Sequence, residues 1–170
     1  MKAVRLHRYH EPPSVDEVPE PAIKGPLDVL VRIGAAGLCR TDLHIYEGQW
    51  EHLTHPQLPF TLGHENAGWV EEVGSAVSNL APGDTVILHP HITCGLCRYC
   101  RAGDEMHSTS GKFPGVDGTD GGMADYLLTD ARSAVKLDPS LQPADVAALA
   151  DAGLTAYHAV KKPPQGPDSI

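Results

Sequence analysis

Hydrophobic and polar residues alternate in short runs along much of this chain, which is the pattern of half-buried β-strands. The clearest run spans residues 28–36, where Val29, Val31 and Ile33 fall on one side. The same reading predicts further strands at residues 2–6, 67–73, 85–88, 124–129 and 134–137. Each run is short and ends near turn-forming residues, so the strands are expected to be joined by turns and loops.

Proline and glycine mark the regions between these runs. Residues 11–26 contain five prolines and are expected to form an edge strand and a loop. One short helix is expected from Thr41 to about Gly48, and another over residues 143–150. Residues 94–122 form an irregular excursion too long for an ordinary connection, so something other than a core must stabilise it. Many short strands with two or three short helices predict a barrel or a sandwich.

Composition narrows the class of protein. The chain has 170 residues, 41 % hydrophobic and 21 % charged, as expected for one globular domain of ordinary size. A formal net charge of −9 argues against nucleic acid or an anionic membrane as partner, because both favour a basic surface. The amino terminus carries no apolar signal segment, and no apolar run approaches the roughly 20 residues of a membrane-spanning helix.

Three of the four cysteines lie close together along the chain. Cys94, Cys97 and Cys100 fall within seven positions, whereas Cys39 stands alone. This spacing is typical of a metal-binding knuckle in a reducing compartment, whereas secreted disulfide frameworks space their cysteines for bridging. We therefore expect a cytoplasmic protein.

A second set of candidate residues surrounds Cys39 and His64. A thiolate and an imidazole are two of the ligand types that zinc prefers. Thr41, Asp42 and His44 follow Cys39 closely and offer a hydroxyl, a carboxylate and an imidazole. Such groups can move a proton or hold a metal ligand in place. A reaction site centred on a metal is the hypothesis that these residues support.

Five segments carry a resemblance to a known family. They are Gly-Leu-Cys-Arg-Thr-Asp-Leu-His (37–44), Leu-Gly-His-Glu-Asn-Ala-Gly (62–68), Cys-Gly-Leu-Cys-Arg-Tyr-Cys (94–100), Asp-Gly-Gly-Met-Ala-Asp-Tyr (120–126) and Asp-Ala-Gly-Leu-Thr-Ala-Tyr-His (151–158). In this order they closely resemble the catalytic domain of zinc-dependent medium-chain alcohol dehydrogenases. The resemblance implies a mainly β fold, a GroES-like partly open β-barrel with a few short helices and a zinc-lobe loop. It also implies a catalytic zinc ion and an alcohol–carbonyl reaction that uses a nicotinamide cofactor.

Residue by residue, the resemblance places the ligands of the catalytic zinc at Cys39, His64 and Asp151. Three ligands leave one corner of the tetrahedron for water or substrate, as a catalytic zinc requires. Glu65 matches the family's carboxylate behind the metal, and Asp42 matches the residue that orients the ligand histidine. From its position alone, Asp42 is also a candidate N-cap for the helix after Cys39, and the two roles are compatible.

The resemblance also assigns a proton relay and two cofactor contacts. Thr41 matches the hydroxyl that bonds the substrate oxygen, and His44 matches the outer end of the relay. The alternative for His44 is a solvated residue on a helix. Arg40 matches a basic residue near the cofactor pyrophosphate, and Thr155 matches a hydroxyl beside the nicotinamide.

The second cysteine cluster departs from the family pattern. Cys94, Cys97 and Cys100 match three of the four cysteines of a structural zinc lobe, but Ser108 stands at the fourth position. A neutral hydroxyl is a poor zinc ligand, so a possible structural zinc is expected to take His107 as its fourth ligand. Two neighbouring carboxylates are weaker candidates: Asp104 and Glu105. The alternative is a lobe without metal, mobile or oxidised.

The resemblance divides the chain into residues 1–162, the catalytic domain with its lobe at about 91–122, and residues 163–170, a linker. Full-length family members continue into a dinucleotide-binding domain, but no Gly-x-Gly-x-x-Gly segment occurs here. We therefore expect NAD(P) to bind only in a full-length context and this chain alone to have little dehydrogenase activity. Surface and strand edges left open without that domain predict self-association.

The expected substrate is a small alcohol or carbonyl compound. Two other functions stay open. One is a weak zinc hydrolase or esterase, because zinc brings the pKa of bound water near ~7. The other is a non-catalytic metal-binding module for assembly.

Overall fold

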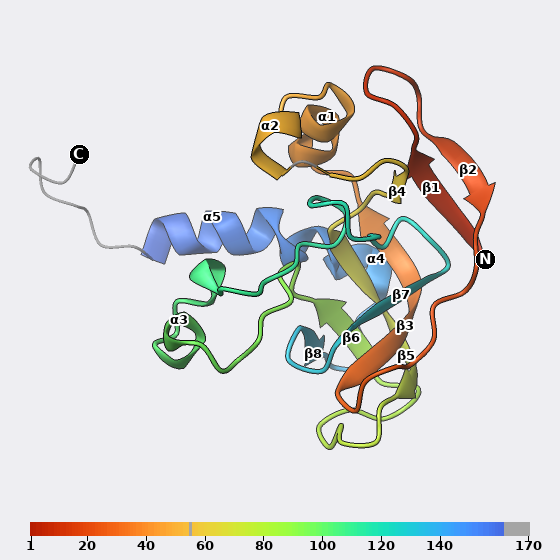
Figure 1. Ribbon diagram of the computed structural model, residues 1–170. Coiled ribbons are helices and arrows are strands. Elements are labelled where there is room, and N and C mark those ends of the chain that lie inside the picture. Colours follow the sequence, from red (N-terminus) through yellow and green to blue (C-terminus); the bar gives the residue numbers. More distant parts are fainter. Residues whose placement is uncertain (55, 162–170) are drawn as a thin grey trace, which may run out of the picture.

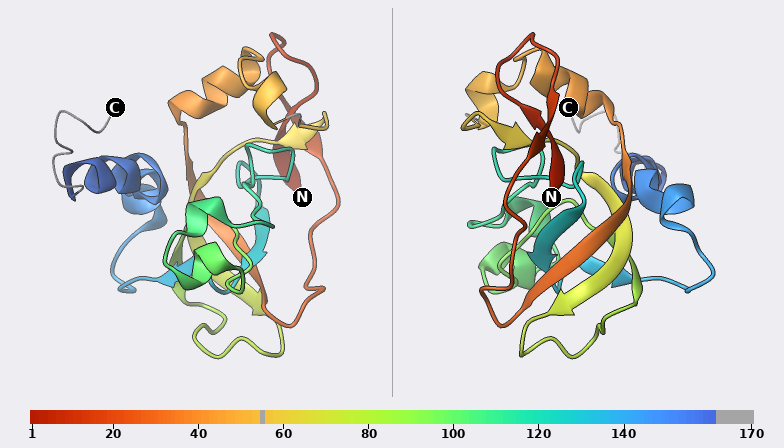
Figure 2. Two further views of the ribbon diagram at one scale, coloured as in Figure 1. Left: turned by 60° about the vertical axis from the view of Figure 1, so that its left-hand side comes forward. Right: turned by 90° about the vertical axis from the view of Figure 1, so that its right-hand side faces the viewer.

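The computed structural model describes residues 1–54 and 56–161, and two antiparallel sheets form its framework (Figure 1). The larger sheet has the order β7-β3-β5-β6-β8 and the smaller one β2-β1-β4. The strands are β1 (Lys2–Leu6), β2 (Ser14–Glu17), β3 (Asp28–Gly37), β4 (Phe60–Thr61), β5 (Glu65–Val73), β6 (Thr85–Leu88), β7 (Tyr126–Asp130) and β8 (Ala134–Lys136). Figure 2 shows the larger sheet curling on itself. A mainly β, half-barrel fold with few short helices confirms the predicted fold class.

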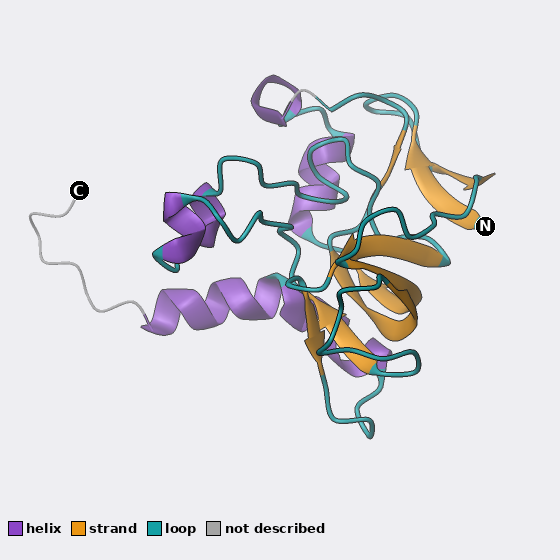
Figure 3. Cartoon of the chain, turned by 60° about the horizontal axis from the view of Figure 1, so that its bottom comes forward, coloured by secondary structure: helices purple, strands orange, loops and turns teal. Residues whose placement is uncertain are grey.

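The helices are short and lie outside the sheets (Figure 3). They are α1 (Arg40–Tyr46), α2 (Glu51–Thr54), α3 (Arg98–Arg101), α4 (Pro143–Val146) and α5 (Ala152–Lys161), with 3₁₀ turns η1 (Glu105–His107) and η2 (Ala147–Ala150). No helix in the described ranges is long and apolar enough to cross a membrane.

The apolar side of the predicted strands forms the main core. Val29 and Val31 of β3 are completely buried and pack with Val70 of β5, Val86 of β6 and Leu127 of β7. This packing holds β3 and β5 in register, so that the last residue of β3 lies beside the first residue of β5. The carboxyl end of one strand and the amino end of the other therefore meet at one edge of the core.

A second core cluster attaches α1 to the smaller sheet. Ile45 of α1 packs with Leu6 of β1, Phe60 of β4 and two loop residues, Leu62 and Val116. Because α1 directly follows the end of β3, this cluster fixes where residues 39–46 lie relative to β5.

The differences from the predicted elements have local causes. The strand predicted from residue 124 begins at Tyr126, because Ala124 instead forms an isolated bridge with Ala3 of β1. The predicted loops contain the short helices α2 and α3. Helix α5 was not predicted: it has no buried residue, so it lacks the core-facing apolar stripe by which helices are recognised. The predicted linker at 163–170 lies outside the described residues.

Candidate metal centre

His64 is the buried centre of the site. It follows Gly63, whose φ of 98° lies in the region that favours glycine, and it directly precedes β5. The His64 Nδ1 atom lies 3.5 Å from Asp42 Oδ1, and its Nε2 lies 3.3 Å from Asp151 Oδ2. Neither ring nitrogen completes a hydrogen bond with any residue in the described part of the chain. The ring therefore faces a carboxylate oxygen on each side.

Cys39 reaches the site because β3 ends beside the start of β5. Gly37 pairs with Glu65 in the strand register, and Cys39 is the N-cap of α1. A Cβ at position 37 would overlap the Glu65 carboxylate, so a larger residue there would displace the Glu65 side chain. Asp42, the third residue of α1, accepts a hydrogen bond at Oδ2 from the backbone N–H of Cys39 over 2.9 Å. Asp42 thus caps α1 by reaching back to Cys39, while its other oxygen faces His64.

Asp151 arrives from the opposite end of the sequence, between η2 and α5. Its Oδ2 lies 3.9 Å from Cys39 Sγ. Its other oxygen, Oδ1, accepts a hydrogen bond from Thr155 Oγ1 over 3.2 Å. Glu65, which is 2 % exposed, accepts a hydrogen bond at Oε1 from the backbone N–H of Ala152 over 2.9 Å. Asp151 is therefore held by a bond to its own side chain and by a bond to the backbone of the next residue.

The charges around His64 favour a cation. Burial lowers the pKa of His64, but the nearby carboxylates of Asp151 and Asp42 outweigh burial and raise the pKa to about 10. In turn, His64 holds the pKa of Asp151 below its ordinary value. Without a metal, a proton on His64 supplies the positive charge that these carboxylates require.

A zinc ion fits the same donors. One sulfur, one imidazole nitrogen and one carboxylate oxygen, from Cys39, His64 and Asp151, all lie within 4.8 Å of one another. These are the three ligand types found at zinc sites, and a set of three leaves a fourth position open. Partners behind them are already in place, since Asp42 faces the far nitrogen of His64 and Thr155 bonds the far oxygen of Asp151.

The remaining predicted residues lie on α1 and α5. Arg40 is the first residue of α1 and is exposed, whereas Thr41 and His44 are partly buried. The His44 ring stacks on Trp50 with centroids 6.2 Å apart. Thr155 lies on exposed α5, and its bond to Asp151 was missed because that helix was not predicted. A threonine four positions after an aspartate is the signal that would have revealed it.

The second cysteine cluster is assembled in the lobe around α3. Cys94, Cys97 and Cys100 each place their sulfur within 4.8 Å of the other two. Backbone N–H groups, first that of Leu96, lower the pKa of Cys94 to about 5. The cluster does not include His107, which instead pairs with Asp104. The lobe thus brings the three thiols together without bringing the predicted fourth ligand to them.

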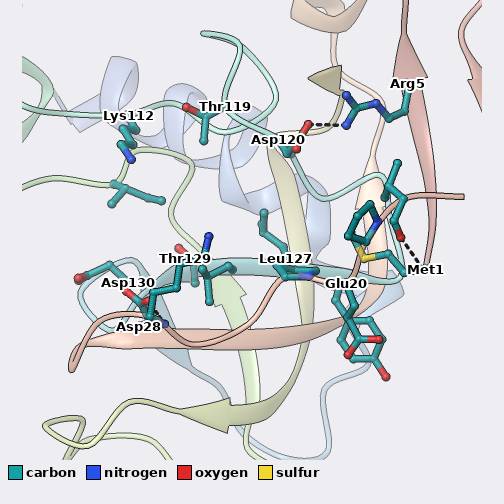
Figure 4. A pocket seen from close by; sticks show the side chains of 18 of the residues that line it. Met1, Arg5, Glu20, Asp28, Lys112, Thr119, Asp120, Leu127, Thr129 and Asp130 are labelled. Carbon is teal, nitrogen blue, oxygen red and sulfur yellow. Dashed lines mark hydrogen bonds and ion pairs between the residues drawn. The ribbon is translucent and has the colours of Figure 1, made fainter. Parts of the chain in front are cut away.

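A cleft of about 990 Å³ lies elsewhere, between the amino-terminal strands and β7 (Figure 4). Arg5 and Asp120 line it and form an ion pair of 2.9 Å. Cys39, His64 and Asp151 are not among its lining residues. This cleft is therefore separate from the candidate metal centre.

Comparison with known proteins identifies relatives over nearly the whole chain. The family model described as alcohol dehydrogenase GroES-like domain matches residues 25–139. D-arabinose 1-dehydrogenase (NADP(+)) of Saccharolobus solfataricus is 41 % identical over 162 residues, which cover 95 % of this chain and 45 % of that protein. An NAD-dependent alcohol dehydrogenase from the same organism is 37 % identical over 167 residues, covering 95 % and 48 %.

Solved structures agree with these relatives. The alcohol dehydrogenase of the hyperthermophilic archaeon Aeropyrum pernix matches with a TM-score of 0.91 and 49 % identity, covering 95 % of this chain and 48 % of that one. This chain thus spans about half the length of the curated relatives it matches. The matched residues 25–139 contain all five strands of the curled sheet, from β3 to β8. The chain belongs to the alcohol dehydrogenase GroES-like domain family.

Proposed function

We propose that this chain is the catalytic portion of a zinc-dependent, NAD(P)-dependent alcohol dehydrogenase acting on a small alcohol or carbonyl compound. Cys39, His64 and Asp151 would hold the catalytic zinc. The observation that carries the proposal is the convergence of these donors within 4.8 Å, although Cys39 and Asp151 are 112 positions apart. Two carboxylates placed against a buried imidazole are costly unless a cation compensates their negative charge, so the arrangement supports a metal function.

Bound zinc would polarise the substrate oxygen, and the nicotinamide would accept the hydride. Alcohol oxidation also releases a proton, which this chain's own residues must carry away. Thr41 and His44 lie three positions apart on α1 and thus on one face of the helix. We assign Thr41 to accept the hydroxyl proton and His44 to pass it toward solvent. Nδ1 of His44 is buried without a hydrogen-bond partner among the described residues, which suits a proton acceptor.

Asp42 and Glu65 are assigned supporting roles. Asp42 Oδ1, 3.5 Å from His64 Nδ1, would keep the proton of the neutral ring on Nδ1 and leave Nε2 for the metal. Glu65, through its bond to Ala152, would hold the backbone beside Asp151. Arg40 and Thr155 stay proposed as cofactor contacts.

The proposed activity belongs to a protein that also provides a dinucleotide-binding half, because the relatives are about twice as long as this chain. We expect the 170-residue chain alone to have little dehydrogenase activity. Exposed apolar residues on α5 (Leu154, Tyr157 and Val160) support the proposed self-association. Four free thiols support the proposed cytoplasmic location.

A chimera tests the function. Residues 1–161 would replace the matching half of the Aeropyrum pernix alcohol dehydrogenase, and alcohol-dependent formation of NAD(P)H would be measured. Turnover is expected, and it should disappear in Cys39→Ser and Asp151→Ala but persist in the matched surface variant His158→Ala. A chimera that binds NAD(P)H like its parent but oxidises no alcohol that the parent oxidises would contradict the proposal. Ester hydrolysis by the 170-residue chain, lost in Cys39→Ser, would favour the hydrolase instead.

A further inference from the structure

The three cysteines of the lobe have the spacing of a zinc tetrahedron. Cys97 Sγ lies 3.5 Å from Cys100 Sγ, and Cys94 Sγ lies 3.9 Å from Cys100 Sγ. Zinc–sulfur bonds of about 2.3 Å in a tetrahedron place the sulfurs about 3.8 Å apart. The cluster is held by local backbone, since Cys97 is the N-cap of α3 and its N–H points to Cys94 Sγ at 3.4 Å. Three corners of a metal site are thus already in place.

The Ser108 hydroxyl lies beside two of the three sulfurs. Its Oγ is 3.6 Å from Cys94 Sγ and 4.0 Å from Cys97 Sγ. An oxygen ligand about 2.1 Å from zinc in the same tetrahedron would lie about 3.6 Å from each sulfur. The backbone N–H of Cys94 lies 3.4 Å from Ser108 Oγ, as a donor to it. The Ser108 hydroxyl oxygen is therefore near the distance from Cys94 Sγ and Cys97 Sγ that a fourth ligand would have.

The other candidates for the fourth ligand face away from the sulfurs. His107 Nδ1 pairs with Asp104 Oδ1 at 2.8 Å, and the His107 side chain is 67 % exposed. The His107 ring also packs against Tyr99, with centroids 5.7 Å apart. Glu105 pairs with Arg132 at 2.5 Å. Each of these side chains is engaged with a partner outside the thiol cluster.

We propose that Cys94, Cys97 and Cys100 bind one zinc ion through three thiolates, and that the hydroxyl of Ser108 fills the fourth corner as a weak, displaceable ligand. A neutral hydroxyl holds zinc less firmly than a thiolate or an imidazole, and three thiolates remain when it leaves. The lobe is then an exchangeable metal site whose fourth position is open to a small imidazole or thiol. Binding releases the protons of those thiols that are still protonated. This site does not depend on the proposed dehydrogenase function.

The test uses the 170-residue chain carrying Cys39→Ser, so that the lobe is the only cluster with thiolate ligands. Cobalt(II) spectra report the number of thiolates from their charge-transfer bands, and competition with a chromophoric chelator gives the zinc affinity. Three thiolates are expected. Ser108→Cys should add a fourth and raise the zinc affinity by at least about tenfold, since even hydrogen-bonding partners of ligands change metal affinity about 10–100-fold. Ser108→Ala should keep all three thiolates, and His107→Ala is the matched control with no change expected.

Imidazole is the second probe. It should alter the cobalt spectrum of the Cys39→Ser chain and of its Ser108→Ala variant, but not that of its Ser108→Cys variant. Loss of lobe metal in His107→Ala, or an unchanged affinity in Ser108→Cys, would overturn the proposal. Native mass spectrometry of the chain with Cys39 intact gives an independent zinc count. A chain that binds no zinc at the lobe in that experiment would overturn it as well.

Discussion

Replacing Asp42 separates two roles that its side chain has in the structure. Its Oδ2 accepts the hydrogen bond from Cys39 N over 2.9 Å, and its Oδ1 lies 3.5 Å from His64 Nδ1. Both side chains are buried, with Asp42 2 % and His64 1 % exposed. Asparagine at position 42 keeps an acceptor for Cys39 N and removes the negative charge. Alanine removes both.

In the metal-free protein, Asp42→Ala should lower the free energy of unfolding by about 2–4 kcal/mol, because it removes a helix cap and one of the two carboxylates that face the buried His64 ring. About 1 kcal/mol of this is the lost helix cap, which Asp42→Asn should retain. Although burial lowers the pKa of His64, the carboxylates raise it from 6.5 to about 10. A raised histidine pKa contributes stability that is fully present below pH 6.5 and is lost as the pH rises through about 10. The deficit of the alanine variant should therefore shrink over that interval.

With zinc bound, the neutral His64 ring needs an acceptor for its Nδ1–H. If the amide oxygen at position 42 serves Cys39 N, the amide NH₂ group faces Nδ1–H, and two donors oppose each other. Asp42→Asn should then lower the zinc affinity about 10–100-fold. Urea unfolding in chelator and zinc competition measure the two effects, with Asp145→Asn, an exposed carboxylate on α4, as the matched control. If Asp42→Asn binds zinc as tightly as the wild type while Asp42→Ala is destabilised, Asp42 is only a helix cap.

Three further predictions use related measurements. Thr155→Val removes the 3.2 Å bond to Asp151 and should weaken zinc binding there by up to about tenfold, whereas Thr155→Ser should not; equal affinities in zinc competition would refute this. Chelation should expose the amides of residues 91–122 to hydrogen exchange before those of the larger sheet, and simultaneous exposure of both would count against a separate lobe site. Self-association, followed by size-exclusion chromatography, should fall in a Leu154→Glu/Tyr157→Glu variant; a wild-type chain that stays monomeric at high concentration contradicts the prediction.

The strands could be predicted because each has one face in the core, which imposes a period of two on residues such as Val29 and Val31. The convergence of Cys39, His64 and Asp151 could not be derived from spacing and came only from the family resemblance. For the lobe, sequence chemistry favoured His107 over Ser108, because imidazole is the better ligand. In the structure, His107 at the end of η1 pairs with Asp104, whereas the next residue, Ser108, faces Cys94. Residue type alone does not predict which of the two side chains points to the thiols.

The stability of helix α5 should depend on the metal centre beside its first turn. It has ten residues and none is buried, whereas isolated helices shorter than about 12–15 residues are marginal in water. The described hydrogen bonds that join it to the rest of the chain lie in its first turn, through Ala152 to Glu65 and through Thr155 to Asp151. Because Asp151 also faces His64, a cation held there would draw the first turn of α5 onto the core. Metal binding and the order of α5 should therefore be linked.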